Sequence, residues 1–411
     1  MDLLSSFKLS ARNVVRNRRR SLVTFLAVLI GFVALSLFEG YFMSVYDALE
    51  DQAIVGERLG HVTVVKKGFF QHAEQDPQKY SFSGAELEAA TEKLKALDNV
   101  ALVSPRLSLS GLISNGNSSR IYIGEGVRPE DMVALRGEKY ADLPGSLKAS
   151  EPVGAVMGAK LAQALGLKPG ETVTLMGSTL DGLANAISVK LLEASSTGSV
   201  GTDDKYVLLP YDAVRRLQGT DGAERIVLVL KDPAQLDQTM QQVAAALTGA
   251  GMEVETRTWK EMSSYYGQVR GLFDAMYLFI SVVVATVVVA SVFNTMGMSI
   301  AERTREIGTL RAIGMQFGTI DWLFVLEGVL IVLGGCLVGV LITEVCALLI
   351  NHSGLTYTPP DATEAVPFTV RLVGENLFGS VFTLVVLSAL AAYLPARRAS
   401  RKPIVEALGH V

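Results

Sequence analysis

The sequence predicts an integral membrane α-helical protein with four transmembrane helices and a large α+β domain inserted between the first two. Of 411 residues, 49% are hydrophobic and only 19% are charged, and the mean hydropathy is +0.34. The apolar residues gather in four segments, each long enough for the roughly 20 residues of helix that cross a bilayer. These segments are Ser21–Phe38, Ala275–Ile300, Trp322–Leu349 and Asn376–Ala396.

Residues 1–20 predict a cytoplasmic amphipathic helix, because basic residues recur every four positions along it. Basic residues also cluster after the second apolar segment and after the fourth. The loop at 351–375, in contrast, holds one Lys or Arg, which is Arg371. Basic residues mark the cytoplasmic side of a membrane protein, so we expect both termini in the cytoplasm of a bacterial inner-membrane protein. The clustered residues are Lys8, Arg12, Arg16, Arg18, Arg19, Arg20, Arg303, Arg305, Arg311, Arg397, Arg398, Arg401 and Lys402.

Transmembrane helix 1 and the start of a stalk are predicted over 21–45. Arg18 to Arg20 before an apolar run also fit a signal peptide, but Ser21–Phe38 is long and no small-residue cleavage site follows it. We therefore expect a retained anchor. Helical periodicity continues through Tyr41 to Ala53 and resumes before the second span, which predicts a two-helix stalk; two short interfacial helices are the alternative.

Residues 46–270 predict a periplasmic α+β core domain with a strand-rich insert at about 140–225. Gly84–Leu97 has helical periodicity with Ser83 as its N-cap. Strands are predicted at 100–104 and 107–113, among others. The glycines at 124, 126, 154 and 158 follow strand-like runs and fit turns better than a dinucleotide-binding fingerprint. The remaining predicted elements are transmembrane helices at 271–300, 321–350 and 376–396, a cytoplasmic helix at 301–320, a periplasmic loop at 351–375 and a cytoplasmic tail at 397–411.

The sequence contains no pattern for a catalytic, metal or cofactor site. It lacks a phosphate-binding P-loop, a GxSxG motif, an HExxH motif and a Cys/His cluster, and nothing indicates nucleic-acid binding. Cys336 and Cys346 lie about 15 Å apart on one helix, too far for a disulfide. We expect a non-enzymatic membrane subunit, with no ATP or Mg²⁺ bound by this chain.

Three carboxylates fall within or near the apolar segments: Glu327, Glu39 and Glu344. A charge inside a bilayer is costly unless it faces protein or water. Glu327 either supports a translocation path or is a hydrogen-bonded structural acid. Glu39 and Glu344 either line a cavity mouth or extend outward to water. Gly334, Gly335 and Gly339 predict close helix packing in the third span.

The segment from Ala301 to Met315 is charged and abuts the second span. Three apolar residues line one face of a short helix, and a loop this short has no core to bury them. Docking on another protein is therefore predicted, with a solvated loop as the alternative. The apolar residues are Ile307, Leu310 and Ile313, and the charged ones are Glu302, Arg303, Arg305, Glu306 and Arg311.

This segment resembles the signature of FtsX-like permeases, the membrane subunits of macrolide-exporter (MacB-type) and lipoprotein-release ABC transporters (type VII), close to ER-x-REIG-x-LRA-x-G. The tail from Leu394 to Leu408 and outer-domain phrases such as Lys160 to Glu171 are also similar. The resemblance implies that the 301–315 segment is a coupling helix seated on a separate ABC ATPase, which would bind ATP and Mg²⁺. It also implies mechanotransmission to the periplasmic domain and a dimer with a second permease copy or paralogue.

The branch that fits best is the lipoprotein-release (LolC/LolE-like) group, on Gly60 to Val64 and Gly354 to Pro360. That group implies extraction or export of a lipidated or hydrophobic substrate from membrane lipids to a periplasmic carrier. The alternatives are a MacB-like efflux permease with a periplasmic adaptor and an FtsX-like transmitter that activates a periplasmic enzyme. The alternative from a different functional class is a membrane-anchored receptor that has no ATPase.

Overall fold

The computed structural model describes residues 10, 12–14, 16, 18–136, 145–359, 363 and 365–408. The predicted helix at 1–20 and the start of the predicted insert therefore lie partly outside the described residues. The chain forms two compact units. The helical unit comprises residues 1–47, 269–356 and 367–411, and the α+β unit comprises residues 48–268 and 357–366.

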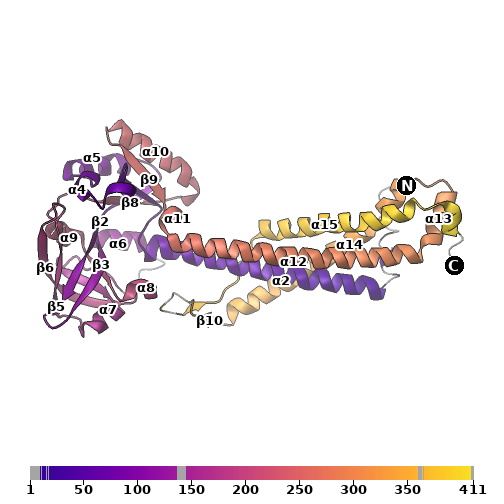
Figure 1. The fold of residues 1–411 in the computed structure, drawn as a ribbon, viewed down its shortest axis with the longest axis horizontal. Coiled ribbons are helices and arrows are strands. Elements are labelled where there is room, and N and C mark those ends of the chain that lie inside the picture. The colour runs from indigo at the N-terminus through magenta and orange to yellow at the C-terminus, as the bar shows by residue number, and fades with distance from the viewer. Residues whose placement is uncertain are drawn as a thin grey trace. The chain divides into compact units, whose positions relative to one another are not determined.

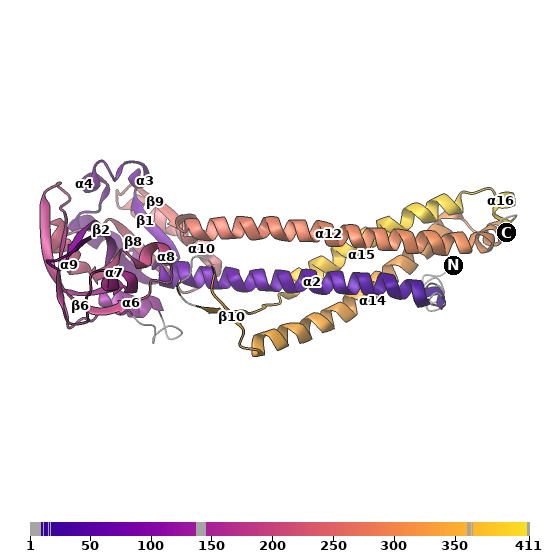
Figure 2. The same ribbon diagram turned by 60° about the horizontal axis from the view of Figure 1, so that its bottom comes forward.

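Four long helices make up most of the helical unit (Figures 1 and 2). Each is long and apolar enough to cross a membrane, which confirms the four predicted spans. At 1.5 Å per residue, the 34 residues of α2 reach about 51 Å, well beyond a hydrocarbon core of about 30 Å. The helices are α2 (Arg18–Asp51), α12 (Ser264–Glu302), α14 (Phe317–His352) and α15 (Gly374–Ser400).

Glycines let α14 approach α2 closely. A Cβ on Gly339 would lie 2.6 Å from the Phe32 ring, and one on Gly335 would lie 3.0 Å from Val28. Phe32 and Val28 are fully buried. A Cβ on Gly334 would make an ordinary contact of 3.7 Å with Phe25. The predicted close packing of the third span is confirmed, and Gly339 is its tightest point.

The α+β unit is built on a nine-stranded sheet with the order β3-β7-β4-β6-β5-β2-β8-β1-β9. Because β3 also pairs with β2, the first six strands close into a ring, and β8, β1 and β9 extend from it as an open sheet. The strands are β1 (Val62–Lys66), β2 (Val100–Ser114), β3 (Ser119–Val127), β4 (Gly154–Gly158), β5 (Thr172–Ser178), β6 (Ala184–Ser195), β7 (Tyr206–Pro210), β8 (Arg225–Leu230) and β9 (Val254–Thr258). A short hairpin, β10 (Thr356–Tyr357) with β11 (Val366–Pro367), lies apart from this sheet.

Helices pack against the sheet over one large apolar core. The helix at 84–95 begins at Ser83 as predicted: Ser83 and Glu86 form a reciprocal capping box that satisfies the first backbone amides. The other elements are α3 (Phe69–His72), α4 (Pro77–Tyr80), α5 (Gly84–Lys95), α6 (Pro129–Arg136), α7 (Ala159–Ala164), α8 (Val200–Asp203), α9 (Tyr211–Gln218), α10 (Leu236–Gly249) and α11 (Trp259–Met262), with a π-helical turn η1 (Gln52–Gly56) and a 3₁₀ turn η3 (Pro233–Gln235).

The two strands predicted at 100–104 and 107–113 are one strand, β2. Pro105 does not interrupt it. The carbonyl of Arg106 accepts from the amide of Glu224 on the β8 side, so the nitrogen of Pro105 faces the other edge. Pairing with β3 begins there only at Leu107, and the missing N–H of proline therefore costs no ladder bond.

The glycines predicted in turns lie in strands instead. Gly124 is in β3, and Gly154 to Gly158 form β4. A Cβ on Gly124 would lie 2.1 Å from the carbonyl oxygen of Val207, and one on Gly158 would lie 2.2 Å from that of Asp203. These positions require glycine because another backbone approaches closely, not because the chain turns.

We expect Gly339→Ala to destabilise the helical unit by about 1–3 kcal/mol, because the added methyl overpacks against Phe32. Gly334→Ala is the matched control, since it gains the same helix propensity without the clash. Thermal unfolding in detergent measures both. An equal or higher midpoint for Gly339→Ala than for Gly334→Ala would contradict the packing argument.

Candidate functional site

The coupling segment, residues 301–320, begins where α12 ends and contains the short helix α13 (Thr304–Ala312). The Thr304 hydroxyl donates to the carbonyls of Ile300, at 3.2 Å, and Ala301, at 2.9 Å, across the break between the helices. Gly314 has a φ of +93°, and the Met315 amide bonds back to the Leu310 carbonyl at 3.0 Å. A left-handed glycine thus ends α13 and turns the chain into α14.

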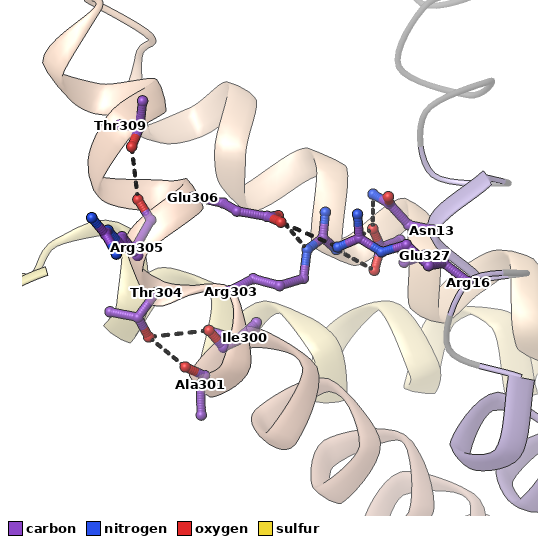
Figure 3. A network of polar contacts seen from close by, with 10 residues as sticks. All are labelled: Asn13, Arg16, Ile300, Ala301, Arg303, Thr304, Arg305, Glu306, Thr309 and Glu327. Atoms are coloured by element: carbon purple, nitrogen blue, oxygen red, sulfur yellow. Dashed lines mark hydrogen bonds and ion pairs between the residues drawn. The ribbon is translucent and has the colours of Figure 1, made fainter. Parts of the chain in front are cut away.

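A buried ion pair holds the start of this segment (Figure 3). Arg303 donates through one guanidinium nitrogen to both carboxylate oxygens of Glu327, at 2.9 and 3.3 Å. Asn13 donates to the same carboxylate at 2.6 Å. The side chains of Arg303 and Glu327 are only 10% and 3% exposed. The structure therefore places Glu327, on α14, in a bonded polar cluster.

Glu306 forms the outer part of the same network. Arg303 donates to it at 2.9 Å and Arg16 at 3.1 Å. Burial opposes the charge of Arg303, but its bonds to Glu306 and Glu327 outweigh this and raise its pKa. The hydrogen bond from Arg303 also lowers the pKa of Glu306. Both groups are therefore charged at neutral pH.

Further polar contacts join the first helical residues to α14 and to the coupling segment. Ser10 donates to the Leu323 carbonyl at 3.2 Å, and Arg20 pairs with Glu302 at 2.5 Å. The Arg20 and Glu302 side chains are about half exposed, and such pairs contribute roughly 0–1 kcal/mol. The buried pair at Arg303 is thus the main electrostatic anchor.

The structure divides the apolar stripe that the sequence placed on one face of the helix. Ile307 is only 2% exposed and Leu310 is partly buried, and both pack into the core of the helical unit. Ile313, in contrast, is 75% exposed. The chain thus buries part of the stripe itself, because α13 packs on α16 (Ile404–Leu408) and α15.

The charged residues of the segment are divided in the same way. Arg305 and Glu302 are exposed, whereas Arg303 points inward. Arg311 donates to the Lys402 carbonyl and lies 4.6 Å from the ring centroid of Phe317. The exposed surface of the segment is therefore built from Arg305, Thr309, Ile313 and their neighbours. The predicted role of this segment in ATPase coupling remains a prediction.

The other two predicted carboxylates lie away from this network. Glu39 is half-buried and accepts a hydrogen bond from Ser380 at 3.5 Å. Glu344 is exposed on α14. Their predicted roles at a cavity mouth remain predictions. The contribution of Asn13 was missed, because nothing in the sequence connects it to a residue 314 positions away.

Comparison with known proteins places this geometry in a family. The FtsX-like permease C-terminal model matches residues 278–404. The MacB-like periplasmic core domain model matches residues 21–246, more than half of the chain. The chain belongs to the MacB/FtsX-like permease family. It is therefore a membrane protein with a MacB-type α+β core domain between its first and second spans.

Curated relatives cover different parts of this permease. The macrolide export ATP-binding/permease protein MacB 1 of Yersinia pestis bv. Antiqua is 23% identical over 97% of the chain and 59% of its own length. MacB of Salmonella choleraesuis is 30% identical over 49% of the chain and 30% of its own length. The chain thus spans less than two thirds of these relatives.

A solved structure, the periplasmic region of MacB from Actinobacillus actinomycetemcomitans, is 16% identical to the permease. The match covers 51% of this chain and 93% of the chain in that structure, with a TM-score of 0.37. That score is too low to support an argument about function.

We expect Arg303→Met to destabilise the permease by about 3–5 kcal/mol, because it leaves the buried Glu327 carboxylate without its charge partner. Replacing both residues by methionine removes the unpaired charge, so the double variant should regain most of the loss. Thermal unfolding in detergent compares them, with the exposed Arg305→Met as control. A double variant no more stable than Arg303→Met would show that the pair is not the anchor.

Proposed function

We propose that this permease is the membrane subunit of an ABC transporter in which the coupling segment receives motion from an ABC ATPase. The observation that carries this proposal is the division of the segment into two sides. Arg303 and Ile307 fasten it to the helical unit. Arg305 and Ile313 are exposed to a partner. A helix that is fixed on one side can pass a displacement to the spans behind it.

The chemistry of the exposed side suits a protein partner. Ile313 is 75% exposed, Phe317 48% and Val405 85%. Ile313 directly follows α13, Phe317 is at the start of α14, and Val405 is on α16, which packs against α13. Exposed large apolar residues beside charged ones are typical of a docking surface. The ATPase supplies ATP and Mg²⁺ binding, for which the 411 residues carry no P-loop.

The orientation follows from the charges and the spans. The coupling segment and the basic clusters lie on the cytoplasmic side of a bacterial inner membrane, and the α+β unit lies on the periplasmic side. In α12, only 11% of the most apolar window is buried within the chain. That helix therefore has surface for membrane lipids and for a second permease copy or paralogue.

We further propose that ATP-driven motion acts on a lipidated or other hydrophobic substrate. Two versions are supported by different observations. The sequence phrases at 60–64 and 354–360 favour lipoprotein release to a periplasmic carrier. The names of the curated relatives favour efflux with a periplasmic adaptor. Reconstitution with the ATPase separates them: release of a lipidated peptide from the membrane supports the first, and export of a soluble amphiphile supports the second.

We expect Ile313→Asp to reduce the amount of ABC ATPase that copurifies with the membrane-inserted permease by at least tenfold. A tenfold loss corresponds to about 1.4 kcal/mol of binding free energy. The side chain is already exposed, so the fold of the permease should not change. Ile121→Asp, at a residue 69% exposed on β3, is the matched control. If ATPase recovery is the same for both variants, the coupling segment is not the docking site.

A further inference from the structure

The α+β unit contains a cavity of about 680 Å³ between the turn after η1, the helices α3 and α4, and the strands β2, β3, β5, β7 and β8. This volume is in the range of small-molecule sites. Its lining combines apolar and charged side chains. The apolar ones include Leu59, Phe69, Leu107, Leu109, Leu180 and Leu217.

Several of the charged lining residues meet at one buried carboxylate. Glu125, on β3, has a side chain only 5% exposed. It accepts from Arg225 at 2.7 Å and from Arg58 at 3.4 Å. Arg58 also donates to the Tyr206 hydroxyl at 2.6 Å. Two guanidinium groups that line the cavity therefore share this carboxylate, and Arg225 also lies 3.6 Å from Glu224.

A third guanidinium lies beside them without a hydrogen-bond partner. Arg106 on β2 is directly opposite Arg225 on β8, so their side chains leave the same face of the sheet. Arg106 is fully buried. Within the described residues its Nε and both terminal nitrogens have no acceptor, and neither does the Nε of Arg225. Buried donors without acceptors are costly and rare in folded proteins.

Nearby carboxylates do not supply the missing acceptors. Asp131 accepts from Ser104 at 2.5 Å, and Glu224 accepts from the amide and hydroxyl of Ser108 at 2.8 and 3.1 Å. Glu57 and Glu74 lie at the cavity but are exposed to solvent. Within the described residues, N–H donors of Arg106 and Arg225 therefore remain without hydrogen-bond acceptors, although three carboxylates lie nearby.

We propose that this cavity binds an anion of the carboxylate or phosphate class at Arg225, with the buried Arg106 adding positive charge behind the cavity lining and the apolar part of an amphiphilic ligand against the leucine side chains. Planar guanidinium groups bind such oxyanions through paired N–H donors. The same chemistry fits a free phosphate and a lipid headgroup. The site is independent of the coupling segment and requires no ATPase.

The test uses the full chain in phosphatidylcholine nanodiscs without any ATPase, so a failure of ATPase docking cannot affect it. Inorganic phosphate, hexyl phosphate and the neutral hexyl glucoside are titrated, and the thermal midpoint and calorimetric affinity are measured. A ligand that binds only the folded state raises the midpoint with concentration. We expect hexyl phosphate to raise it and hexyl glucoside to leave it unchanged.

The variants Arg106→Met and Arg225→Gln should each weaken hexyl phosphate binding at least tenfold. Arg120→Gln, at an exposed arginine of β3, is the control and should bind as the native chain does. Arg106→Met removes an unpartnered buried charge, so without ligand it should be at least as stable as the native chain.

The two phosphate probes distinguish the sources of the anion. Equal affinity for inorganic and hexyl phosphate supports a free anion, and tighter binding of hexyl phosphate supports an amphiphile. Two results overturn the proposal. One is the absence of any phosphate-dependent shift in the native chain, which would mean that water satisfies the arginines. The other is unchanged binding in both Arg106→Met and Arg225→Gln.

Discussion

The buried ion pair between Arg303 and Glu327 is the interaction on which the membrane part of this permease depends. A carboxylate that is 3% exposed on an apolar helix is tolerable only with a charge partner close by. The partner is the residue at the break between α12 and α13. A single contact therefore satisfies the charge of the third span and fixes the direction in which the coupling segment leaves the second. Because Asn13 binds the same carboxylate, three parts of the chain meet at one group.

The dependence of Glu327 on distant partners also explains which features could be predicted from the sequence and which could not. Apolar length, basic clusters and the Ser83 cap are local signals, and the spans and the start of α5 followed from them. Glu327 was recognised as needing a partner, but Arg303 was predicted to face a partner protein. The local sequence around Arg303 is the same whether its side chain faces a partner protein or packs inward. Side chains that pair across 24 or 314 residues produce no periodic pattern in the sequence. The continuity of β2 through Pro105 was missed for a similar reason, since it depends on which edge of the strand lacks a neighbour.

The two buried ionic clusters described above differ in how well their donors and acceptors are matched. In the helical unit, Arg303 is bonded to Glu306 and Glu327, so donors and acceptors are matched. In the α+β unit, Arg58 and Arg225 share Glu125 and Arg225 also pairs with Glu224, but Arg106 has no hydrogen-bond acceptor among the described residues. A matched cluster is sufficient to hold a structure together. An unmatched one keeps an energetic cost that a bound anion would remove, which is why the second cluster indicates a ligand and the first an anchor.

Arg58 connects the unmatched cluster to the backbone of the α+β unit. Its φ of +59° is uncommon for a residue other than glycine, and it follows the π-helical turn at 52–56, a feature frequent at functional sites. Its guanidinium is held by Glu125 and Tyr206. An anion bound next to these groups would add negative charge beside Arg58 and so change how firmly the strained turn is held. Because that turn directly continues α2, the first membrane-spanning helix, occupancy of the cavity and the position of the end of this helix would be energetically linked.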